Sequence, residues 1–147
     1  QGQEWGRSKV IASSEFSDKN VGKLDHNSYE KDNETNWLNW KHRDANFELV
    51  EFYKSLIRVR KENKLLRISN PEDFQFIAAN GSNVAIGFLI SKEGESIAVL
   101  MNSHQSDTAE FYLNGDNWTP IISTQDGIKL RETSIKLPAL SGIILKK

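Results

Sequence analysis

Residues 1–9 (QGQEWGRSK) and 26–40 (HNSYEKDNETNWLNW) open and close the stretch that decides how this chain is organised. Residues 1–40 contain three of the four tryptophans, and no amphipathic period runs through them. An irregular segment of this length is usually a functional loop, a lid or a linker. We therefore expect residues 3–45 to form a long functional loop that the rest of the chain supports.

The composition is that of a folded protein, with 37% hydrophobic and 27% charged residues. The 19 basic and 20 acidic residues leave a net charge of −1, which argues against nucleic acid or an anionic membrane as a partner. No apolar run approaches the roughly 20 residues needed to cross a bilayer. The absence of cysteine excludes disulfides and thiolate sites. The compartment stays open, with secretion or surface attachment favoured over the cytoplasm.

Residues 46–63 (NFELVEFYKSLIRVRKEN) have the period of an amphipathic helix. Their apolar side chains recur at i, i+3, i+4, i+7 and i+8, which places them on one face. Glu48 lies in the first turn and Arg60 and Lys61 lie in the last, so these charges suit the helix dipole. The sequence therefore predicts one helix here, with an apolar stripe formed by Leu49, Phe52, Tyr53, Leu56 and Ile57.

Beyond Pro71 the sequence alternates between apolar and polar residues and contains four dipeptides that favour tight turns. Short alternating runs between such turns are typical of an antiparallel β-sandwich. We therefore predict an all-β sandwich over residues 70–147, which makes the whole chain α+β. The dipeptides are Asn80-Gly81, Glu93-Gly94, Asn114-Gly115 and Asp126-Gly127, and the predicted strands are 73–79, 83–91, 96–102, 107–113, 118–124, 132–137 and 141–146. The side chains predicted to face the core are Phe74, Phe76, Ile86, Phe88, Ile90, Ile97, Val99, Met101, Ala109, Phe111 and Leu113.

Several motifs in the first half of the chain match, in order, those of a known enzyme family. Residues 2–9 (GQEWGRSK) have a G-x-E pattern followed by Arg-Ser-Lys. The run Asn27-Ser28-Tyr29 is followed by Asp32, Asn36 and Trp40. The first motif resembles the segment that leaves the eighth barrel strand in the α-amylase superfamily (glycoside hydrolase family 13). The second resembles the N-S-Y…D…N…W spacing of type I pullulanases.

Two further segments are similar to the same superfamily. Residues 32–40 (DNETNWLNW) resemble a segment of isoamylases and glycogen-debranching enzymes, and residues 50–61 (VEFYKSLIRVRK) resemble the last barrel helix. The resemblance implies that residues 1–68 are the C-terminal end of a catalytic TIM (β/α)8 barrel, formed by the long loop and one helix. It also implies that residues 70–147 are the C-terminal β-sandwich domain. Specificity of the pullulanase, isoamylase or glycogen-debranching type stays open.

The resemblance implies a function for the longer protein to which this chain would belong. Such debranching glycosidases hydrolyse α-1,6-glucosidic linkages in pullulan, branched dextrin and glycogen, and they retain the anomeric configuration with two carboxylates about 5–5.5 Å apart. In this family the catalytic carboxylates come from earlier barrel strands, so we expect them upstream of residue 1. The chain begins with Gln inside a motif, so we expect a piece that is inactive alone. We expect the missing barrel to be its main packing partner.

Within the loop, the resemblance and the position at the active-site face of a barrel point to residues that bind substrate. Aromatic rings can stack on sugar rings, and amides, carboxylates and guanidinium groups can bond to hydroxyls. Trp37 and Trp40 are expected chiefly to pack the loop, and Glu4 is expected to brace it in a buried pair with Arg7. The candidate substrate-binding residues are Trp5, Arg7, Asn27, Tyr29 and Asp32.

Two other interpretations concern the sandwich. It could bind α-glucan by itself, with Tyr112 and Trp118 as the aromatic platform, or it could serve only to support the barrel. The three histidines are dispersed, and Asp32-Asn33-Glu34 lacks the alternate spacing of a calcium loop. We therefore expect no metal site and no cofactor in this chain, with calcium left open for the longer protein.

Overall fold

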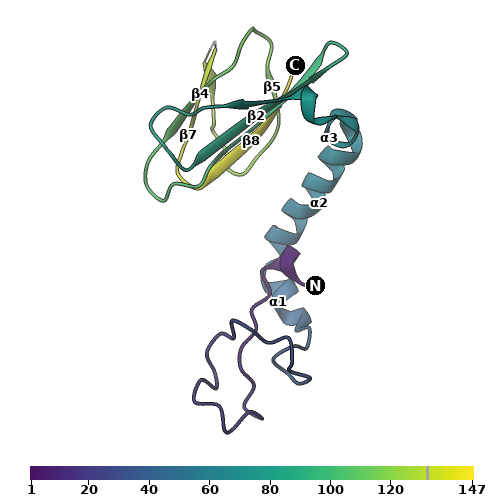
Figure 1. The fold of residues 1–147 in the computed structure, drawn as a ribbon, viewed down its shortest axis with the longest axis vertical. Coiled ribbons are helices and arrows are strands. Elements are labelled where there is room, and N and C mark those ends of the chain that lie inside the picture. The colour runs from purple at the N-terminus through teal and green to yellow at the C-terminus, as the bar shows by residue number, and fades with distance from the viewer. Residues whose placement is uncertain (132) are drawn as a thin grey trace. The chain divides into compact units, whose positions relative to one another are not determined.

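The structure is a computed structural model that describes residues 1–131 and 133–147. Its contacts divide the chain into two units, residues 1–55 and residues 56–147 (Figure 1). The first unit is mostly irregular, and the second contains every named strand. The predicted α+β class is therefore confirmed.

Helix α2 (Phe47–Glu62) forms where the apolar period predicts a helix. The pattern did not predict the 3-10 turns η1 (Gln3–Trp5) and η2 (Pro71–Asp73), or the short helices α1 (Trp40–Ala45) and α3 (Leu65–Ile68). Helix α1 occupies the end of the predicted loop, because the Asn39 side chain caps it by accepting a 3.0 Å hydrogen bond from the Lys41 backbone N–H. None of the helices in the described ranges is long and apolar enough to cross a membrane.

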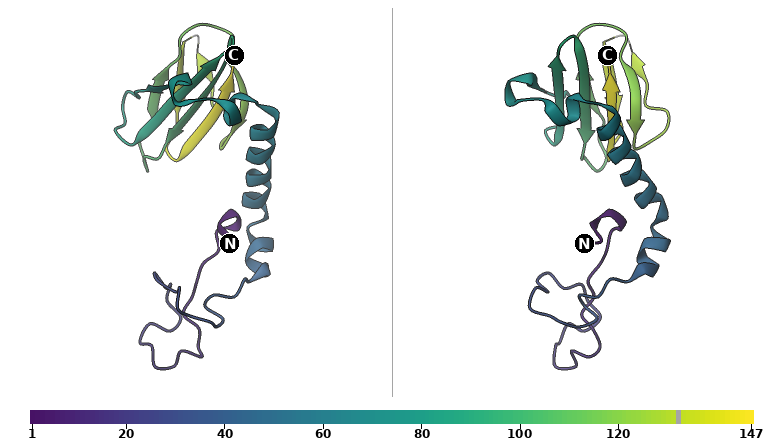
Figure 2. Two further views of the ribbon diagram at one scale, coloured as in Figure 1. Left: turned by 45° about the vertical axis from the view of Figure 1, so that its right-hand side comes forward. Right: turned by 90° about the vertical axis from the view of Figure 1, so that its right-hand side faces the viewer.

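Two antiparallel sheets face each other in the second unit, as the sequence predicts (Figure 2). One sheet has the strand order β1-β2-β3-β8-β5 and the other has the order β4-β7-β6. The two-residue strand β6 was not predicted, and Glu132 of the predicted strand 132–137 lies outside the described residues. The strands are β1 (Phe74–Ile77), β2 (Ala85–Lys92), β3 (Glu95–Asn102), β4 (Ala109–Tyr112), β5 (Thr119–Ser123), β6 (Leu130–Arg131), β7 (Ser134–Leu137) and β8 (Ser141–Lys146).

The hairpin between β2 and β3 explains why the glycine dipeptides mark turns. Its turn residues Glu93 and Gly94 have φ angles of 54° and 86°. Positive φ at both turn positions is the signature of a type I′ turn, whose twist matches that of the flanking strands. Gly81, Gly115 and Gly127 in the other dipeptides also have positive φ, so the predicted turn positions are confirmed.

The main core lies between the two sheets. Phe111 on β4 is fully buried there, together with Leu100 on β3 and Leu145 on β8. The predicted inward positions of strand 107–113 are confirmed, since Ala109 on β4 and Leu113 just after it belong to the same cluster. This packing of two apolar sheet faces holds the sandwich together.

In the five-stranded sheet, the face that packs against this core is the opposite of the face that was predicted to do so. Leu89, Ala98 and Leu100 face the other sheet, and the alternate residues Ile90 and Ile97 are buried beneath α3 on the outer face. Strands with apolar residues on both faces carry no alternation that identifies the inner one. The predicted burial of Ile90 and Ile97 is confirmed, although they pack beneath α3 and not between the sheets. Four other predicted core residues on β1, β2 and β3 are exposed, so that prediction is wrong for them: Phe74, Phe76, Ile86 and Met101.

We predict that Gly87→Ala destabilises the sandwich. A Cβ at this position on β2 would lie 2.8 Å from Cε1 of Phe111 and 2.9 Å from Cδ2 of Leu100. Both side chains are fully buried, so neither can move aside freely. Overpacking of this kind lowers the free energy of unfolding by about 1–3 kcal/mol.

Urea denaturation followed by circular dichroism measures this loss. The control is Ser91→Ala on the same strand, whose exposed side chain predicts a change within about 0.5 kcal/mol. Equal stability of the two variants would contradict the close packing at Gly87.

Candidate functional site

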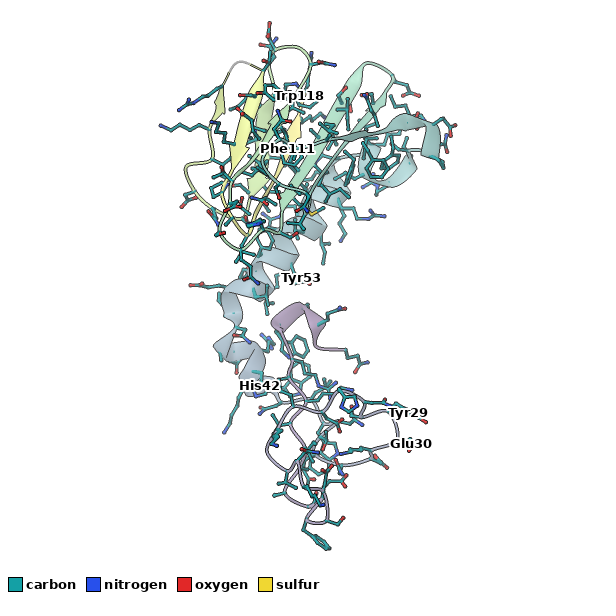
Figure 3. The ribbon with its side chains drawn as sticks, turned by 60° about the vertical axis from the view of Figure 1, so that its left-hand side comes forward. Tyr29, Glu30, His42, Tyr53, Phe111 and Trp118 are labelled. Atoms are coloured by element: carbon teal, nitrogen blue, oxygen red, sulfur yellow. The ribbon has the colours of Figure 1, made fainter. Side chains whose placement is uncertain are left out.

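Hydrogen bonds from side chains help to hold the loop in the first unit. Figure 3 shows the side chains of this loop as sticks. Thr35 is buried, and its Oγ1 accepts a 3.0 Å hydrogen bond from the Ala12 backbone N–H. Ser14 Oγ donates to Glu34 Oε2 at 2.8 Å. Backbone groups also pair with each other here, as at the bridge between Val10 and Leu24. The side chains satisfy further polar groups that a sheet or helix would otherwise satisfy. They join the segment 12–15 to the segment 33–35.

Asn36 is the centre of a second set of bonds. Its Nδ2 donates to the carbonyl oxygens of Ser28 and Lys31, and its Oδ1 accepts from Ser28 Oγ at 2.8 Å. Lys9 Nζ donates to the same Ser28 Oγ at 2.7 Å, and Arg7 donates to the Asn36 carbonyl oxygen. The half-buried amide therefore joins residue 36 to residues 28–31, and the bonds of Arg7 and Lys9 add residues 7–9 to this set.

Three carboxylate side chains surround Lys31. Its Nζ lies 2.9 Å from Asp25 Oδ2, 3.5 Å from Asp18 Oδ2 and 3.9 Å from Glu15 Oε1. The Asp25 side chain is only 7% exposed. The Asn27 backbone N–H and then the Lys31 ammonium hold the pKa of Asp25 below its usual value. The bond with Asp25 likewise raises the pKa of Lys31. Asp25 and Lys31 therefore stay charged as a pair, and the ion pairs of Lys31 join residues 15, 18 and 25 to residue 31.

Two of the five candidate residues have a clear packing role. Trp5 is 6% exposed, its ring centroid lies 5.5 Å from that of Trp40, and its carbonyl oxygen accepts from Asn46 Nδ2 at 2.8 Å. Arg7 donates to the carbonyl oxygens of Asn36 and Trp37. The expected buried pair of Arg7 with Glu4 is wrong: Glu4 is exposed, and Arg7 braces the loop through backbone oxygens instead.

The other three candidates, Asn27, Tyr29 and Asp32, are exposed on the same loop. Tyr29 is 78% exposed, and its hydroxyl donates to Glu30 Oε1 at 2.6 Å (Figure 3). That bond raises the pKa of Tyr29. The bonds of Ser28 to Lys9 and Asn36 connect the Asn27–Tyr29 segment to the part of the chain that contains Arg7. A role of these side chains in substrate binding stays a prediction.

A hollow of about 470 Å³ lies beside the start of α1, and two exposed tryptophans line it. Trp37 is 63% exposed and Trp40 is 57% exposed, although we expected both chiefly to pack the loop. The signal for this hollow that the sequence offered was the repeated tryptophan in WLNW. Two large aromatic residues so close together at the end of a polar loop are uncommon. The remaining lining residues are Glu34, Leu38, Asn39 and Lys41.

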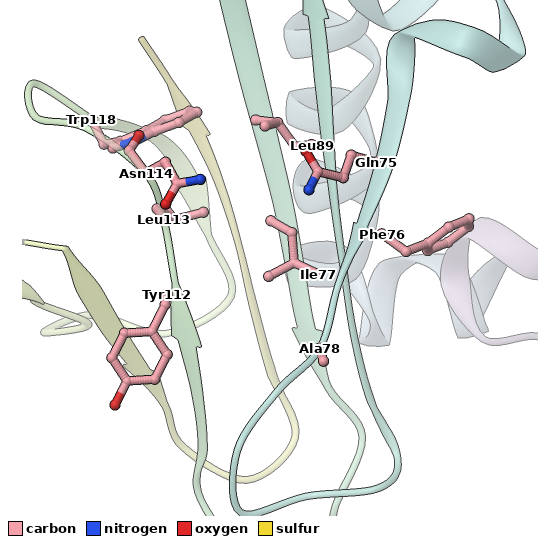
Figure 4. A pocket seen from close by; sticks show the side chains of 9 residues that line it. All are labelled: Gln75, Phe76, Ile77, Ala78, Leu89, Tyr112, Leu113, Asn114 and Trp118. Carbon is pink, nitrogen blue, oxygen red and sulfur yellow. The ribbon is translucent and has the colours of Figure 1, made fainter.

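The sandwich has a smaller hollow of about 220 Å³ between β1 and the end of β4 (Figure 4). Trp118 lines it but is 6% exposed, and its Nε1 donates to the Asn114 carbonyl oxygen at 3.3 Å. Tyr112 is 54% exposed. The proposed aromatic platform of Tyr112 with Trp118 is therefore wrong, because Trp118 belongs to the core.

Among residues 1–131 and 133–147, no group of three or more His, Asp or Glu side chains is close enough to hold a metal ion. In the Asp32-Asn33-Glu34 run, the Asn33 amide donates to Glu15 and the Glu34 carboxylate accepts from Ser14. Two of these three side chains are thus engaged in holding the loop.

Comparison with known proteins places this geometry in context. No family model matches the chain, and no curated protein matches it. Solved structures do match. The Group B Streptococcus pullulanase SAP aligns with 99% of this chain and 25% of its own, with a TM-score of 0.76 at 15% sequence identity. The fold of this chain is therefore similar to that of about a quarter of this pullulanase.

The same pullulanase in complex with maltotetraose aligns over the same shares with a TM-score of 0.74 at 16% identity. The trehalulose synthase MutB from Pseudomonas mesoacidophila MX-45 aligns with 67% of this chain and 17% of its own, with a TM-score of 0.54 at 20% identity. This chain thus spans about a quarter of the length of the pullulanase and less than a fifth of the length of the trehalulose synthase. The structural similarity to α-amylase-family enzymes is confirmed at the level of the fold.

We predict that Asn36→Ala loosens the loop without affecting the sandwich. The change removes three hydrogen bonds, leaves the Lys31 carbonyl oxygen without its Asn36 donor, and leaves the Ser28 carbonyl oxygen with the Lys31 backbone N–H alone. Loss of a partner for partly buried polar groups costs about 1–3 kcal/mol, or roughly 5- to 150-fold in an opening equilibrium. Amide hydrogen exchange at Ala12 and Thr35 should accelerate within this range.

The exposed Asn27 provides the matched control, since Asn27→Ala removes an amide with no side-chain bond of this kind. Exchange in β3 and β8 should be the same in both variants. Unchanged exchange at Ala12 in Asn36→Ala would show that the amide does not hold the loop.

We predict that the loop loosens in acid, below about pH 4. A carboxylate whose folded pKa lies below its usual value of 3.8 stabilises the fold above that value, and the stabilisation is lost as the pH falls through the folded pKa. Asp25 is such a group. Tryptophan emission of a Trp118→Phe background, which reports only on the three loop tryptophans, should change in this range.

Asp25→Asn should remove most of this pH dependence, because its side chain no longer titrates. A transition of the same size and midpoint in Asp25→Asn would assign the acid sensitivity to another group.

Proposed function

We propose that this chain is the C-terminal part of a pullulanase-like glycoside hydrolase that cleaves α-1,6-glucosidic linkages in α-glucans. The observation that carries the proposal is the alignment of 99% of the chain with a pullulanase, compared with 67% for a trehalulose synthase. The motif Asn27-Ser28-Tyr29 with Asp32, which resembles type I pullulanases, adds support from the sequence.

In this proposal the chain supplies support and one wall of the substrate groove, and the catalytic carboxylates belong to the remainder of the enzyme. Tyr29, Asn27 and Asp32 are exposed on one loop, as contact with an oligosaccharide requires. Trp5 and Arg7 act by holding that loop in position, because both are engaged by the chain itself. Pullulanase SAP was solved with maltotetraose, so an α-glucan is the ligand class that the comparison favours.

Exposed apolar surface supports a packing role for the remaining residues. On α2, Phe47 and Ile57 are each more than half exposed, and on the outer face of the sandwich Phe76 is 74% exposed. Apolar side chains exposed on two separate elements are expected where further protein covers them. We propose that the barrel of the longer enzyme covers them, which leaves the sandwich as a supporting domain.

Hydrolysis assays test this proposal. We expect the isolated chain to release no reducing sugar from pullulan, and the protein encoded by the whole reading frame to release maltotriose. Within that protein, Tyr29→Ala should raise KM about tenfold, since a lost aromatic contact of about 1.4 kcal/mol corresponds to this factor.

Tyr112→Ala is the matched control, because it removes an exposed tyrosine from the sandwich. A whole protein that rearranges sucrose and leaves pullulan intact would contradict the proposal and favour the trehalulose synthase relationship.

A further inference from the structure

The hollow beside α1 combines aromatic and polar groups in a way that the loop's own stability does not require. Trp37 and Trp40 line it and expose more than half of their side-chain surfaces. Exposed indole rings leave a large apolar area in water, which is unfavourable unless a ligand or partner covers it.

The Trp40 ring is held in place before any ligand binds. The buried Trp5 packs against it at a tilt of 35°, and Asn39 caps the helix that begins at Trp40. Trp5 is in turn fixed by the bond from Asn46 to its carbonyl oxygen. A ring that is already immobilised loses little conformational entropy when a ligand stacks on it.

The backbone at Trp37 is fixed as well. Arg7 donates to the Trp37 carbonyl oxygen at 3.3 Å. The Trp37 backbone N–H donates to the Glu34 carbonyl oxygen in a turn. Both tryptophans therefore project from a backbone that the bonds of the loop define.

The polar groups around the rings indicate the class of ligand. Glu34 offers a carboxylate, Lys41 an ammonium group and Asn39 an amide at the edge of the same hollow. The Glu34 backbone N–H and the Ser14 hydroxyl lower the pKa of Glu34, so its carboxylate is ionised at neutral pH. Apolar ring faces bordered by separate donors and acceptors match a sugar, which has C–H faces and hydroxyl edges. A surface meant only for burial against protein would be poorer in charge.

We propose that Trp37 and Trp40 form a binding subsite for an α-linked gluco-oligosaccharide, with one sugar ring stacked on Trp40 and its neighbour directed towards Trp37. The ligand class rests on the proposed function, whereas the location rests on the hollow and its lining. Tyr29 does not line this hollow, so the loop would contact the glucan at two places.

Titration of the 147-residue chain with maltotetraose tests the subsite. In a Trp118→Phe background, tryptophan fluorescence should change saturably at millimolar sugar. Trp37→Ala should weaken binding about tenfold, because one aromatic contact is lost. Trp40→Phe should weaken it less, because a smaller ring remains, while Tyr112→Ala on the sandwich should bind as the parent does.

Amide exchange at Ala12 and Thr35 shows whether each variant keeps the loop fold, and Trp37→Ala has no ring contact with Trp5 to lose. Parent-like affinity of a folded Trp37→Ala would overturn the proposal, as would the absence of any saturable change in the parent. Loss of binding in Tyr29→Ala alone would move the site to that segment. The pullulan assay on the whole protein is independent of this titration, so failure of the subsite and failure of the proposed function are distinguishable.

Discussion

The first unit depends on one constraint, which is that backbone polar groups outside helices and sheets still need hydrogen-bond partners. Between residues 7 and 37, side chains supply some of those partners and other backbone groups supply the rest of the recorded bonds. Thr35 and Asn36 each hold distant backbone in place, and Arg7 bonds to two carbonyl oxygens. The loop is thus organised mainly by specific polar contacts and only secondarily by a few buried apolar residues. Such an arrangement keeps aromatic rings on the surface, where they are available for binding.

The second unit is organised in the opposite way, by apolar packing between two sheets. Gly87 allows β2 to approach Phe111, and the buried Asn102 donates to the carbonyl oxygens of Asp107 and Pro138 where β3 ends. A domain of this size has a modest core, so the close fit at Gly87 contributes a sizeable part of its stability. The sandwich offers no exposed aromatic platform that includes Trp118. Its features fit support better than recognition.

These two modes of stabilisation suit the two proposed roles. A polar loop with exposed Tyr29, Trp37 and Trp40 is adapted to meet a sugar with hydroxyl groups and apolar faces. A compact sandwich with an apolar outer face is adapted to pack against a larger domain. The similarity in fold to a quarter of a pullulanase is consistent with this division, since the chemistry would then lie in the other three quarters.

Local patterns in the sequence determined much of the architecture. The helical period located α2, the glycine dipeptides located the turns, and alternation located most strands, because each depends on the conformational preferences of nearby residues. Tertiary structure decided the rest. Which face of β2 and β3 is inside depended on α3, since apolar residues occupy both faces of these strands. The role of Trp5 as a buried support for Trp40, and the exposure of Trp40 itself, depended on contacts between residues 35 positions apart, which no local pattern encodes.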